Sequence, residues 1–534
     1  MRDCRRVFVT AIAAFTALTA ALPGASAAAA AAAVRTQSGW VQGSAEDGLT
    51  VYRGIPFAAP PVGRLRWRAP QPPLSWSGVR KADRFAPICM QDRPWWTGGN
   101  TQLSEDCLYL NIWTPAASPS AALPVMVWIY GGGFSSGSAS MPIFNGAQLA
   151  KHGVVIVSIA YRVGPMGFMA LPALSAESAH HVSGNYGMLD QLAALRWVQS
   201  NIAAFGGNPH RVTIFGESAG AISVSVLAAS PLGRGLFQGA ISESGGSFGP
   251  TRTPPEMGEN IQTLRNAERD GVAFEKRLGV SSLAQLRQLP AETIQRASSP
   301  PVRFWPVLDG WVIPGDQYDL YQKGRYNDVP VLIGTNSDEG ALFGGAPTQS
   351  DYEHSVQARF GPFAKQILQQ YPATAAQWRQ SSMDLMRDEG FAWHTWVWAR
   401  LQAKTGRSNV YVYYFDHVAP RPADAPWKNA PGAVHSEEIA YVFQYDQPPP
   451  LRWGPTDRAL SNDMAAYWTH FAKEGNPNGP GVPRWPAFTD SSTSVMHFTD
   501  APHVGSVPNL PRLKVLDAYF AWRRTPRGAA WANR

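Results

Sequence analysis

Short apolar segments that alternate with helical patterns constrain the fold of this chain most strongly. Residues 125–130 (VMVWIY) and 154–160 (VVIVSIA) are continuous apolar runs of strand length, as expected for strands that are buried on both faces. Strands separated by helices predict an α/β fold built on a large, mostly parallel sheet. Further strands are predicted at residues 211–215, 238–242, 329–333 and 409–415, and helices over residues 188–205 and 219–229.

Composition narrows the class of protein further. The chain has 534 residues, of which 45% are hydrophobic and 16% are charged, which excludes a disordered chain, a coiled coil and a small disulfide scaffold. The net charge of +7 is not gathered into a run of Lys and Arg, so no nucleic-acid partner is predicted. Residues 251–300 have a polar, helical pattern and are interpreted as an insertion, and no linker divides the chain.

The N-terminus has the pattern of a secretory signal peptide. Three arginines within the first six residues precede an apolar run over residues 7–22, and the small residues 25–27 offer a cleavage site. The run is short and rich in Ala and Thr, which disfavours a membrane span, although an uncleaved anchor is the alternative. We therefore predict a signal peptide over residues 1–27, a single domain over residues 28–534, and a secreted or periplasmic protein without stable membrane insertion.

The cysteine count agrees with export. Cys4 falls within the predicted signal peptide, which leaves Cys89 and Cys107 in the mature chain. In an oxidising compartment these two cysteines predict one disulfide, with two buried free thiols as the alternative. No Cys/His cluster has the spacing of metal ligands, so a zinc site is not predicted.

A candidate nucleophile lies in the pattern G-x-S-x-G, which occurs at Ser135, Ser218 and Ser247. A nucleophile elbow requires a strand before the serine and a helix after it. It also requires small residues two positions away, where the strand and the helix nearly touch. Only Ser218 lies between a predicted strand and a predicted helix, so Ser218 is the predicted nucleophile.

A glycine-rich loop follows the strand at residues 125–130. Gly131, Gly132 and Gly133 allow backbone N–H groups to approach a reacting carbonyl oxygen closely. In an α/β-hydrolase such a loop forms the oxyanion hole together with the N–H of the residue after the nucleophile, which is Ala219 here. Neither G-x-G-x-x-G nor Gly-Lys-Ser/Thr is present, which makes a phosphate-binding loop the weaker interpretation.

The other members of a Ser–acid–His triad follow later strands in the chain order of this fold. Asp338 and Glu339 come after the strand at residues 329–333 and compete for the role of the acid. His435 and His417 come after the strand at residues 409–415 and compete for the role of the base. The pattern alone leaves both choices open.

Longer motifs resemble those of one known family. They include RGIPFAAPPVGRLRW at residues 53–67, EDCLYLN at 105–111, WIYGGGF at 128–134, NYG at 185–187, the stretch from FGGNP to FGESAG at 205–220, and residues 468–478. These motifs make the chain similar to the type-B carboxylesterase and cholinesterase family of α/β-hydrolases, in particular to a secreted carboxylesterase of bacterial type. The resemblance implies a large, mostly parallel central sheet flanked by helices, with helical insertions around an active-site gorge.

The resemblance also implies which residues form the site. The acid of the family is a Glu in a D-E-G stretch, which falls on Glu339, and its histidine lies in a G-x-x-H stretch, which falls on His435. The family's oxyanion donors fall on Gly132, Gly133 and Ala219.

Two further features follow from the same resemblance. Glu217 and Ser244 match positions that support the histidine and the acid from behind, and the first disulfide of the family falls on Cys89 and Cys107. The place of the Trp that binds quaternary ammonium in cholinesterases is taken by Thr97, so a true cholinesterase is not expected.

Ester hydrolysis is the predicted function. We expect a serine carboxylesterase that acts on hydrophobic aryl or short-to-medium alkyl esters through an acyl-enzyme, with a small-molecule ester as its partner and no cofactor or metal. Trp95, Trp96, Phe304 and Trp305 are candidates for the pocket lining. The alternatives are a lipase, lactonase or amidase with the same triad, or a non-catalytic cholinesterase-like binding protein, which the retained triad argues against.

Overall fold

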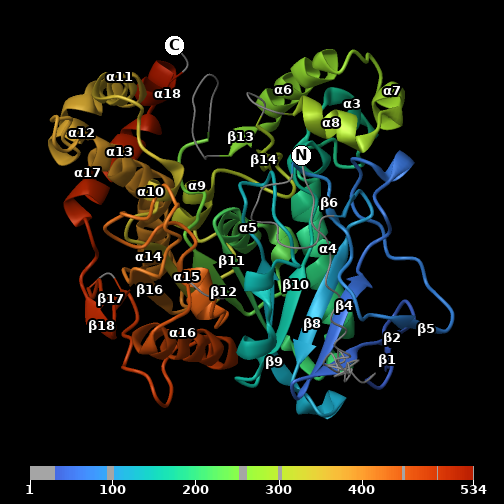
Figure 1. Cartoon of the computed structure of the whole chain (residues 1–534). Coiled ribbons are helices and arrows are strands. Elements are labelled where there is room, and N and C mark those ends of the chain that lie inside the picture. Colours follow the sequence, from blue (N-terminus) through green and yellow to red (C-terminus); the bar gives the residue numbers. More distant parts are fainter. Residues whose placement is uncertain are drawn as a thin grey trace, which may run out of the picture.

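The structure is a computed structural model, and it describes residues 31–92, 102–251, 261–298, 303–447, 451–489 and 491–532 (Figure 1). The predicted signal peptide over residues 1–27 and the candidate pocket residues Trp95, Trp96 and Thr97 lie outside these ranges. None of the helices in the described ranges combines the length and the apolar composition that crossing a bilayer requires.

One large mixed sheet organises the described part of the chain. It has eleven strands there, and the pairings from β10 across to β17 are parallel, whereas the outer pairings at both edges are antiparallel. Across the sheet the order is β18 (Pro502–Gly505), β17 (Val495–Phe498), β16 (Val410–Phe415), β15 (Val331–Asn336), β12 (Gly239–Glu243), β11 (Gly207–Glu217), β9 (Leu123–Ile129), β10 (Val155–Ile159), β8 (Tyr109–Thr114), β4 (Leu49–Pro56) and β3 (Ser44–Glu46).

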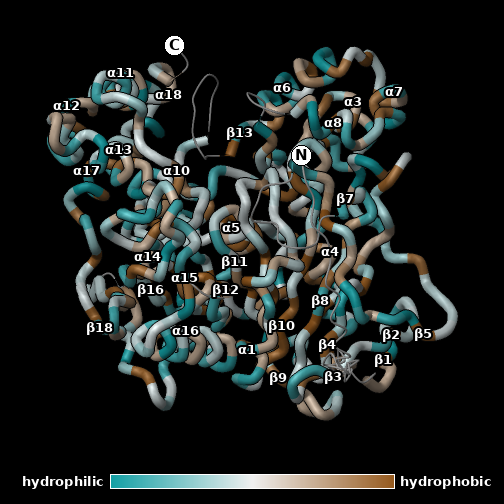
Figure 2. Tube along the Cα trace, viewed as in Figure 1, coloured by the Kyte–Doolittle hydropathy of each residue, from teal (hydrophilic) through white to brown (hydrophobic). Residues whose placement is uncertain are grey.

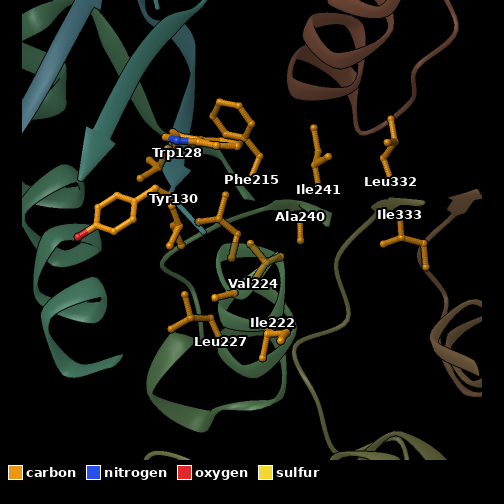
Figure 3. Packing of buried hydrophobic residues seen from close by; sticks show 14 of the residues in the cluster. Trp128, Tyr130, Phe215, Ile222, Val224, Leu227, Ala240, Ile241, Leu332 and Ile333 are labelled. Atoms are coloured by element: carbon orange, nitrogen blue, oxygen red, sulfur yellow. The ribbon is translucent and has the colours of Figure 1, made fainter. Parts of the chain in front are cut away.

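Helices bury both faces of this sheet, which explains why its central strands are apolar throughout. Figure 3 shows Trp128, Phe215, Ile241 and Leu332 pointing to one side, while Ala240 and Ile333 point to the other side, toward Ile222, Val224 and Leu227 of α5 (Ala219–Ala229). The first side is closed by Phe443, whose ring packs on Trp128 and Phe215, and by α16 (Pro455–Glu474). Figure 2 shows hydrophobic segments concentrated in β8, β9 and β10.

The remaining helices form groups at the ends of the strands (Figure 1). The predicted insertion is mainly helical in its described part and lies beside α3 (Pro172–Glu177); its helices are α6 (Leu264–Arg277), α7 (Leu283–Gln288) and α8 (Ala291–Ala297). Around the sheet lie α1 (Ala147–Ala150), α2 (Gly164–Phe168), α4 (Tyr186–Asn201), α9 (Gln317–Gln322), α10 (Gly340–Phe343), α14 (Trp393–Thr405) and α15 (Glu438–Val442). A second group of helices lies across the molecule from α6, α7 and α8 in Figure 1. It consists of α11 (Gln349–Phe360), α12 (Ala364–Gln370), α13 (Trp378–Arg387), α17 (Leu510–Arg523) and α18 (Pro526–Ala532).

Smaller elements complete the fold. The strands β1 (Val34–Arg35), β2 (Trp40–Gln42) and β5 (Val79–Lys81) form a separate three-stranded sheet, and two short pairs are β6 (Ile88–Cys89) with β7 (Leu103–Ser104) and β13 (Gln262–Thr263) with β14 (Val307–Leu308). Cys89 and Cys107 are joined by a disulfide, as the cysteine count and the resemblance predict.

The predicted elements differ from the structure mainly at their ends. β11 begins at Gly207 rather than at residue 211, because Gly207 already pairs with Leu123 before the register shifts ahead of Val212. The helix predicted over residues 188–205 ends as an α-helix at Asn201, and its last turn is the 3₁₀ segment Ile202–Phe205. The helix after Ser218 has the predicted bounds.

Candidate active site

Ser218 lies in a sharp turn between β11 and α5. Its backbone has φ 56° and ψ −122°, a region that residues with a Cβ rarely occupy and that tends to mark functional positions. Its N–H donates a hydrogen bond of 2.9 Å to the carbonyl of Glu243 on the neighbouring strand β12. This strained strand–turn–helix geometry is that of a nucleophile elbow.

The two glycines of the G-x-S-x-G pattern make the turn possible. A Cβ added to Gly216 would lie 2.5 Å from the carbonyl oxygen of Ile129, and one added to Gly220 would lie 2.0 Å from the same oxygen. Both distances are far shorter than van der Waals contact, so strand β9 excludes a side chain at either position. The glycines are therefore required by packing against β9 as well as by the turn itself.

The glycine-rich loop after β9 passes directly against Ser218. A Cβ added to Gly131 would lie 2.9 Å from the Cβ of Ser218. Gly132 and Gly133 follow with φ values of 102° and 60°, a conformation that favours glycine. Ala219 is the first residue of α5, so its N–H is among those at the helix start that form no bond within the helix. Ala219 and Gly131 thus lie at the turn, and Gly132 and Gly133 follow Gly131 along the loop.

Glu339 and His435 are in direct contact. Nδ1 of His435 lies 2.5 Å from Oε2 of Glu339, and the other oxygen of Glu339 accepts the N–H of Asn336 at 2.8 Å. Glu339 follows β15 and His435 follows β16, so parallel neighbouring strands deliver both residues to the same edge of the sheet. Both side chains are buried, and the carboxylate fixes the orientation of the imidazole.

The competing candidates have other partners. Asp338 accepts a hydrogen bond from Gln380 at 3.2 Å, and burial raises the pKa of its carboxyl to about 6. His417 lies between Asp457 and Asp500, at 2.9 Å from each. Among the candidate pairs, the structure brings together Glu339 and His435.

The second nitrogen of His435 lies at the elbow. Nε2 is 3.1 Å from Oε1 of Glu217, the residue immediately before Ser218, and the same oxygen accepts the hydroxyl of Ser436 at 2.5 Å. Burial raises the pKa of Glu217. The imidazole is therefore flanked by a buried carboxyl group on each side.

Two more buried carboxyl groups, those of Glu243 and Glu438, lie close to Glu217 and were not predicted from the sequence. Glu243 accepts the indole N–H of Trp468 at 2.7 Å, and burial raises its pKa to about 8. Glu438 accepts a hydrogen bond from the side chain of Asn336, and burial, followed by the charge of Glu217, raises its pKa well above the usual value. An acidic residue inside the apolar strand at residues 239–243 was the signal that could have revealed Glu243.

Ser244, the second predicted supporting residue, is fully buried directly after β12. It has φ 56°, and its N–H donates to the carbonyl of Gly334 at 2.9 Å. Ser244 therefore holds the end of β12 against β15, the strand that leads to Glu339.

Hydrogen bonds join the loop of the acid to the loop of the histidine. We call residues 336–339 the acid loop and residues 416–437 the histidine loop. Across them, the N–H of Ala433 donates to Oγ of Ser337 at 2.8 Å, and the N–H of Asp338 donates to the carbonyl of Ala433 at 2.7 Å. The side-chain amide of Asn336 donates to the carbonyl of Val434 at 2.8 Å. The two loops are thus fixed to each other as well as through the Glu339–His435 contact.

Aromatic rings surround the histidine and the glycine-rich loop. Phe343 and Phe391 have ring centroids 5.0 and 4.7 Å from that of His435, and the Phe343 side chain is 51% exposed. Of the predicted pocket residues, Trp305 is buried and packs on Phe134, next to the glycine-rich loop. Phe304 packs on Phe274 of α6 instead.

The fold and this arrangement define the class of protein. A strained serine turn after a central parallel strand, a glycine-rich loop after the adjacent strand, and a Glu–His pair after two later strands together are the features of an α/β-hydrolase.

Comparisons with known proteins narrow the class to a family. The model of the carboxylesterase family matches residues 30–515. The chain is 39% identical to fumonisin B1 esterase of Sphingopyxis macrogoltabida, over 88% of this chain and 87% of that protein. It is 35% identical to para-nitrobenzyl esterase of Bacillus subtilis strain 168, over 87% and 94% of the two chains. A solved carboxylesterase of Geobacillus stearothermophilus superposes with a TM-score of 0.79 at 34% identity, covering 90% of this chain and 99% of that one.

The chain belongs to the carboxylesterase family. It is a carboxylesterase, an enzyme that hydrolyses ester bonds, and the resemblance of its motifs to the type-B carboxylesterase and cholinesterase family is confirmed.

Proposed function

We propose that the protein hydrolyses hydrophobic carboxylic esters through a Ser218–His435–Glu339 triad and an acyl-enzyme intermediate. The observation that carries this proposal is the position of the His435 imidazole. Its Nδ1 meets Glu339 at 2.5 Å, while its Nε2 lies beside the elbow, 3.1 Å from the residue that precedes Ser218. A histidine held by a carboxylate at one nitrogen can take a proton from a serine at the other, and Ser218 directly follows Glu217 in the chain.

Acylation begins with the transfer of a proton from Ser218 Oγ to His435 Nε2 as Oγ attacks the ester carbonyl carbon. Glu339 keeps the Nδ1 proton in place and stabilises the imidazolium that forms. The N–H groups of Gly132, Gly133 and Ala219 stabilise the negative charge that develops on the carbonyl oxygen. The imidazolium then gives its proton to the departing alkoxide, which leaves the acyl group on Ser218.

Deacylation repeats these steps with water. His435 takes a proton from a water molecule as the water oxygen attacks the acyl carbon, and it returns that proton to Ser218 Oγ when the acid is released. Glu217, on the Nε2 side of the ring, supports the same imidazolium in both half-reactions.

Hydrophobic acyl or alcohol groups are the proposed substrates. The half-exposed ring of Phe343 beside His435 and the rings of Phe134 and Trp305 beside the glycine-rich loop offer apolar contact near the reacting atoms. An ester whose alcohol group carries an aromatic ring fits these surroundings, in line with the name of the para-nitrobenzyl esterase relative. We also propose that the mature protein is exported after removal of residues 1–27, which N-terminal sequencing of protein from the periplasm and the medium tests.

Ser218→Ala tests the nucleophile. We expect kcat for p-nitrophenyl acetate to fall by about 10⁴-fold or more, because triad members act as a unit. An organophosphate should label wild-type protein on Ser218 and leave the variant unlabelled. The matched control is Ser247→Ala, which alters the other buried serine with the same sequence pattern and should keep wild-type kcat. Labelling at Ser135 or Ser247, or an active Ser218→Ala variant, would contradict the proposal.

A further inference from the structure

The histidine loop is long, irregular and held by one buried arginine. Residues 416–437 connect β16 to α15 without a helix or strand, and long irregular segments in compact domains are usually functional. The side chain of Arg421 is only 5% exposed, and it donates to both oxygens of Glu437 at 2.6 and 2.9 Å. It also donates to the carbonyls of Ala430 and Gly432 at 2.7 and 2.6 Å.

Glu437 links Arg421 to Val434, the residue directly before the histidine. Its Oε2, which already accepts from Arg421, also accepts the N–H of Val434 at 2.9 Å. Arg421 thus holds the chain before His435 through Gly432, and Glu437 holds it on both sides, because Glu437 itself lies two residues after the histidine.

The backbone beside His435 needs such restraint. Ser436 has φ 72°, which is unfavourable for a residue with a Cβ and persists only where surrounding contacts impose it. From this backbone position the imidazole reaches Glu339 on one side and Glu217 on the other. A relaxed turn at Ser436 would move the ring away from both.

We propose that Arg421 and Glu437 form a clamp that positions His435 for the ester hydrolysis proposed above, on which this inference rests. Neither side chain contacts the reacting atoms, so both are positioning residues. An arginine is needed because its planar fork bonds both carboxylate oxygens and two carbonyls at once, whereas a lysine is a single point of charge.

Steady-state kinetics of Arg421→Met, Arg421→Lys and Glu437→Gln with p-nitrophenyl acetate test the clamp. We expect Arg421→Met to lower kcat by about 10²-fold with KM within about twofold, because a displaced base costs reactivity rather than binding. Arg421→Lys and Glu437→Gln should lie between this variant and the wild type. The matched control is Arg53→Met, which removes another two-point ion pair, to Glu46 at 2.5 and 2.7 Å, in the distant strands β3 and β4. It should leave kcat unchanged.

Two readouts separate positioning from general destabilisation. The far-downfield proton resonance of the His435–Glu339 hydrogen bond should weaken or shift in Arg421→Met at temperatures where circular dichroism shows a folded chain. Millimolar methylguanidinium should restore part of kcat in Arg421→Ala, and it should not alter the wild-type kcat expected for Arg53→Ala. If Arg421→Met does not fold, Glu437→Gln and Arg421→Lys carry the same comparison.

The outcomes for the two proposals are distinguishable. A wild-type protein without esterase activity, or an active Ser218→Ala variant, overturns the proposed function. An active wild type whose folded Arg421 and Glu437 variants keep full kcat and an unchanged His435 resonance overturns the clamp alone.

Discussion

The residues that allow Ser218 to adopt its conformation, Gly216 and Gly220, lie two positions from it in the chain. His435, by contrast, depends on partners far away in the sequence as well as on Arg421 and Glu437 nearby: Glu339 lies 96 positions from it. The hydrogen bonds of Ala433 and Val434 to the acid loop span 96 and 98 positions. The elbow is therefore built mainly from neighbours in the chain, the strand β11 and the helix α5, packed against β9. The histidine loop is an irregular segment that becomes a site only when the sheet is complete.

This difference predicts how each region fails. A change in the elbow should damage the fold, because a central strand, a helix and a loop meet there within van der Waals distance. A change in the loops should damage chemistry and leave the fold largely intact, because side chains rather than the core set the geometry.

Apart from the loss of the nucleophile itself in Ser218→Ala, the largest expected effect is on the histidine side. Glu339→Gln should lower kcat by about 10³–10⁴-fold, since an amide cannot stabilise the imidazolium and favours the wrong tautomer of His435. Thermal unfolding should change little, because the amide fills the same volume. Stopped-flow and steady-state assays with p-nitrophenyl acetate measure the loss.

Asp338→Asn is the matched control for that variant. The two acids are adjacent, yet Asp338 bonds Gln380 rather than the histidine. We expect kcat near that of the wild type. Equal losses of kcat in the two variants would show that any charge change in the acid loop slows the reaction, and that the Glu339–His435 contact has no special role.

On the elbow side, Gly220→Ala should act on stability first. The added methyl would lie 2.0 Å from the Ile129 carbonyl oxygen, so either β9 or α5 must move. We expect the free energy of unfolding to fall by about 3 kcal/mol, at the upper end for overpacking in a tight core. Urea unfolding followed by tryptophan fluorescence measures the change.

Gly315→Ala provides the comparison for the same substitution. A methyl group there would meet Leu320 at an ordinary distance of 3.7 Å. It should leave the urea midpoint nearly unchanged. A Gly220→Ala protein as stable as this control would mean that the elbow is not packed as tightly as the structure indicates.

The same contrast explains what could be predicted from the sequence. The strand before Ser218, the helix Ala219–Ala229 and the glycine-rich loop follow from periodicity and turn chemistry, which depend on neighbours in the chain. The residues alone did not decide whether Asp338 or Glu339 is the acid, or whether His417 or His435 is the base. The contacts that distinguish these candidates join segments that follow different strands of the sheet. Family motifs pointed to Glu339 and His435.

Other features had no usable local signal. The edge strands β3 and β18 and the strand β17 beside β18 are short, and pairing across a sheet is set by topology. Arg421 resembles any loop arginine until its partners are known. Glu438 was missed because charged residues are expected at the surface unless they are paired, and the same expectation hid Glu243, although its place at the end of an apolar strand was a signal.

A pH-dependent effect on stability is predicted for Glu243, which lies on β12 between the strand of Ser218 and the strand of Glu339. Burial raises its pKa from 4.5 to about 8, so the folded protein holds a proton that the unfolded chain releases. Stability should therefore fall as pH rises from about 4.5 to about 8, by at most about 1.4 kcal/mol per pH unit. Glu243→Gln, which keeps the acceptor for Trp468, should remove this slope.

Glu46→Gln is the control and should keep the slope. The hydrogen bond from Arg53 lowers the Glu46 pKa, so the contribution of Glu46 to stability is lost only as pH falls below the ordinary pKa of a glutamate. Urea unfolding between pH 5 and pH 8 measures these slopes, and parallel curves for wild type and Glu243→Gln would show that Glu243 is ionised in the folded protein.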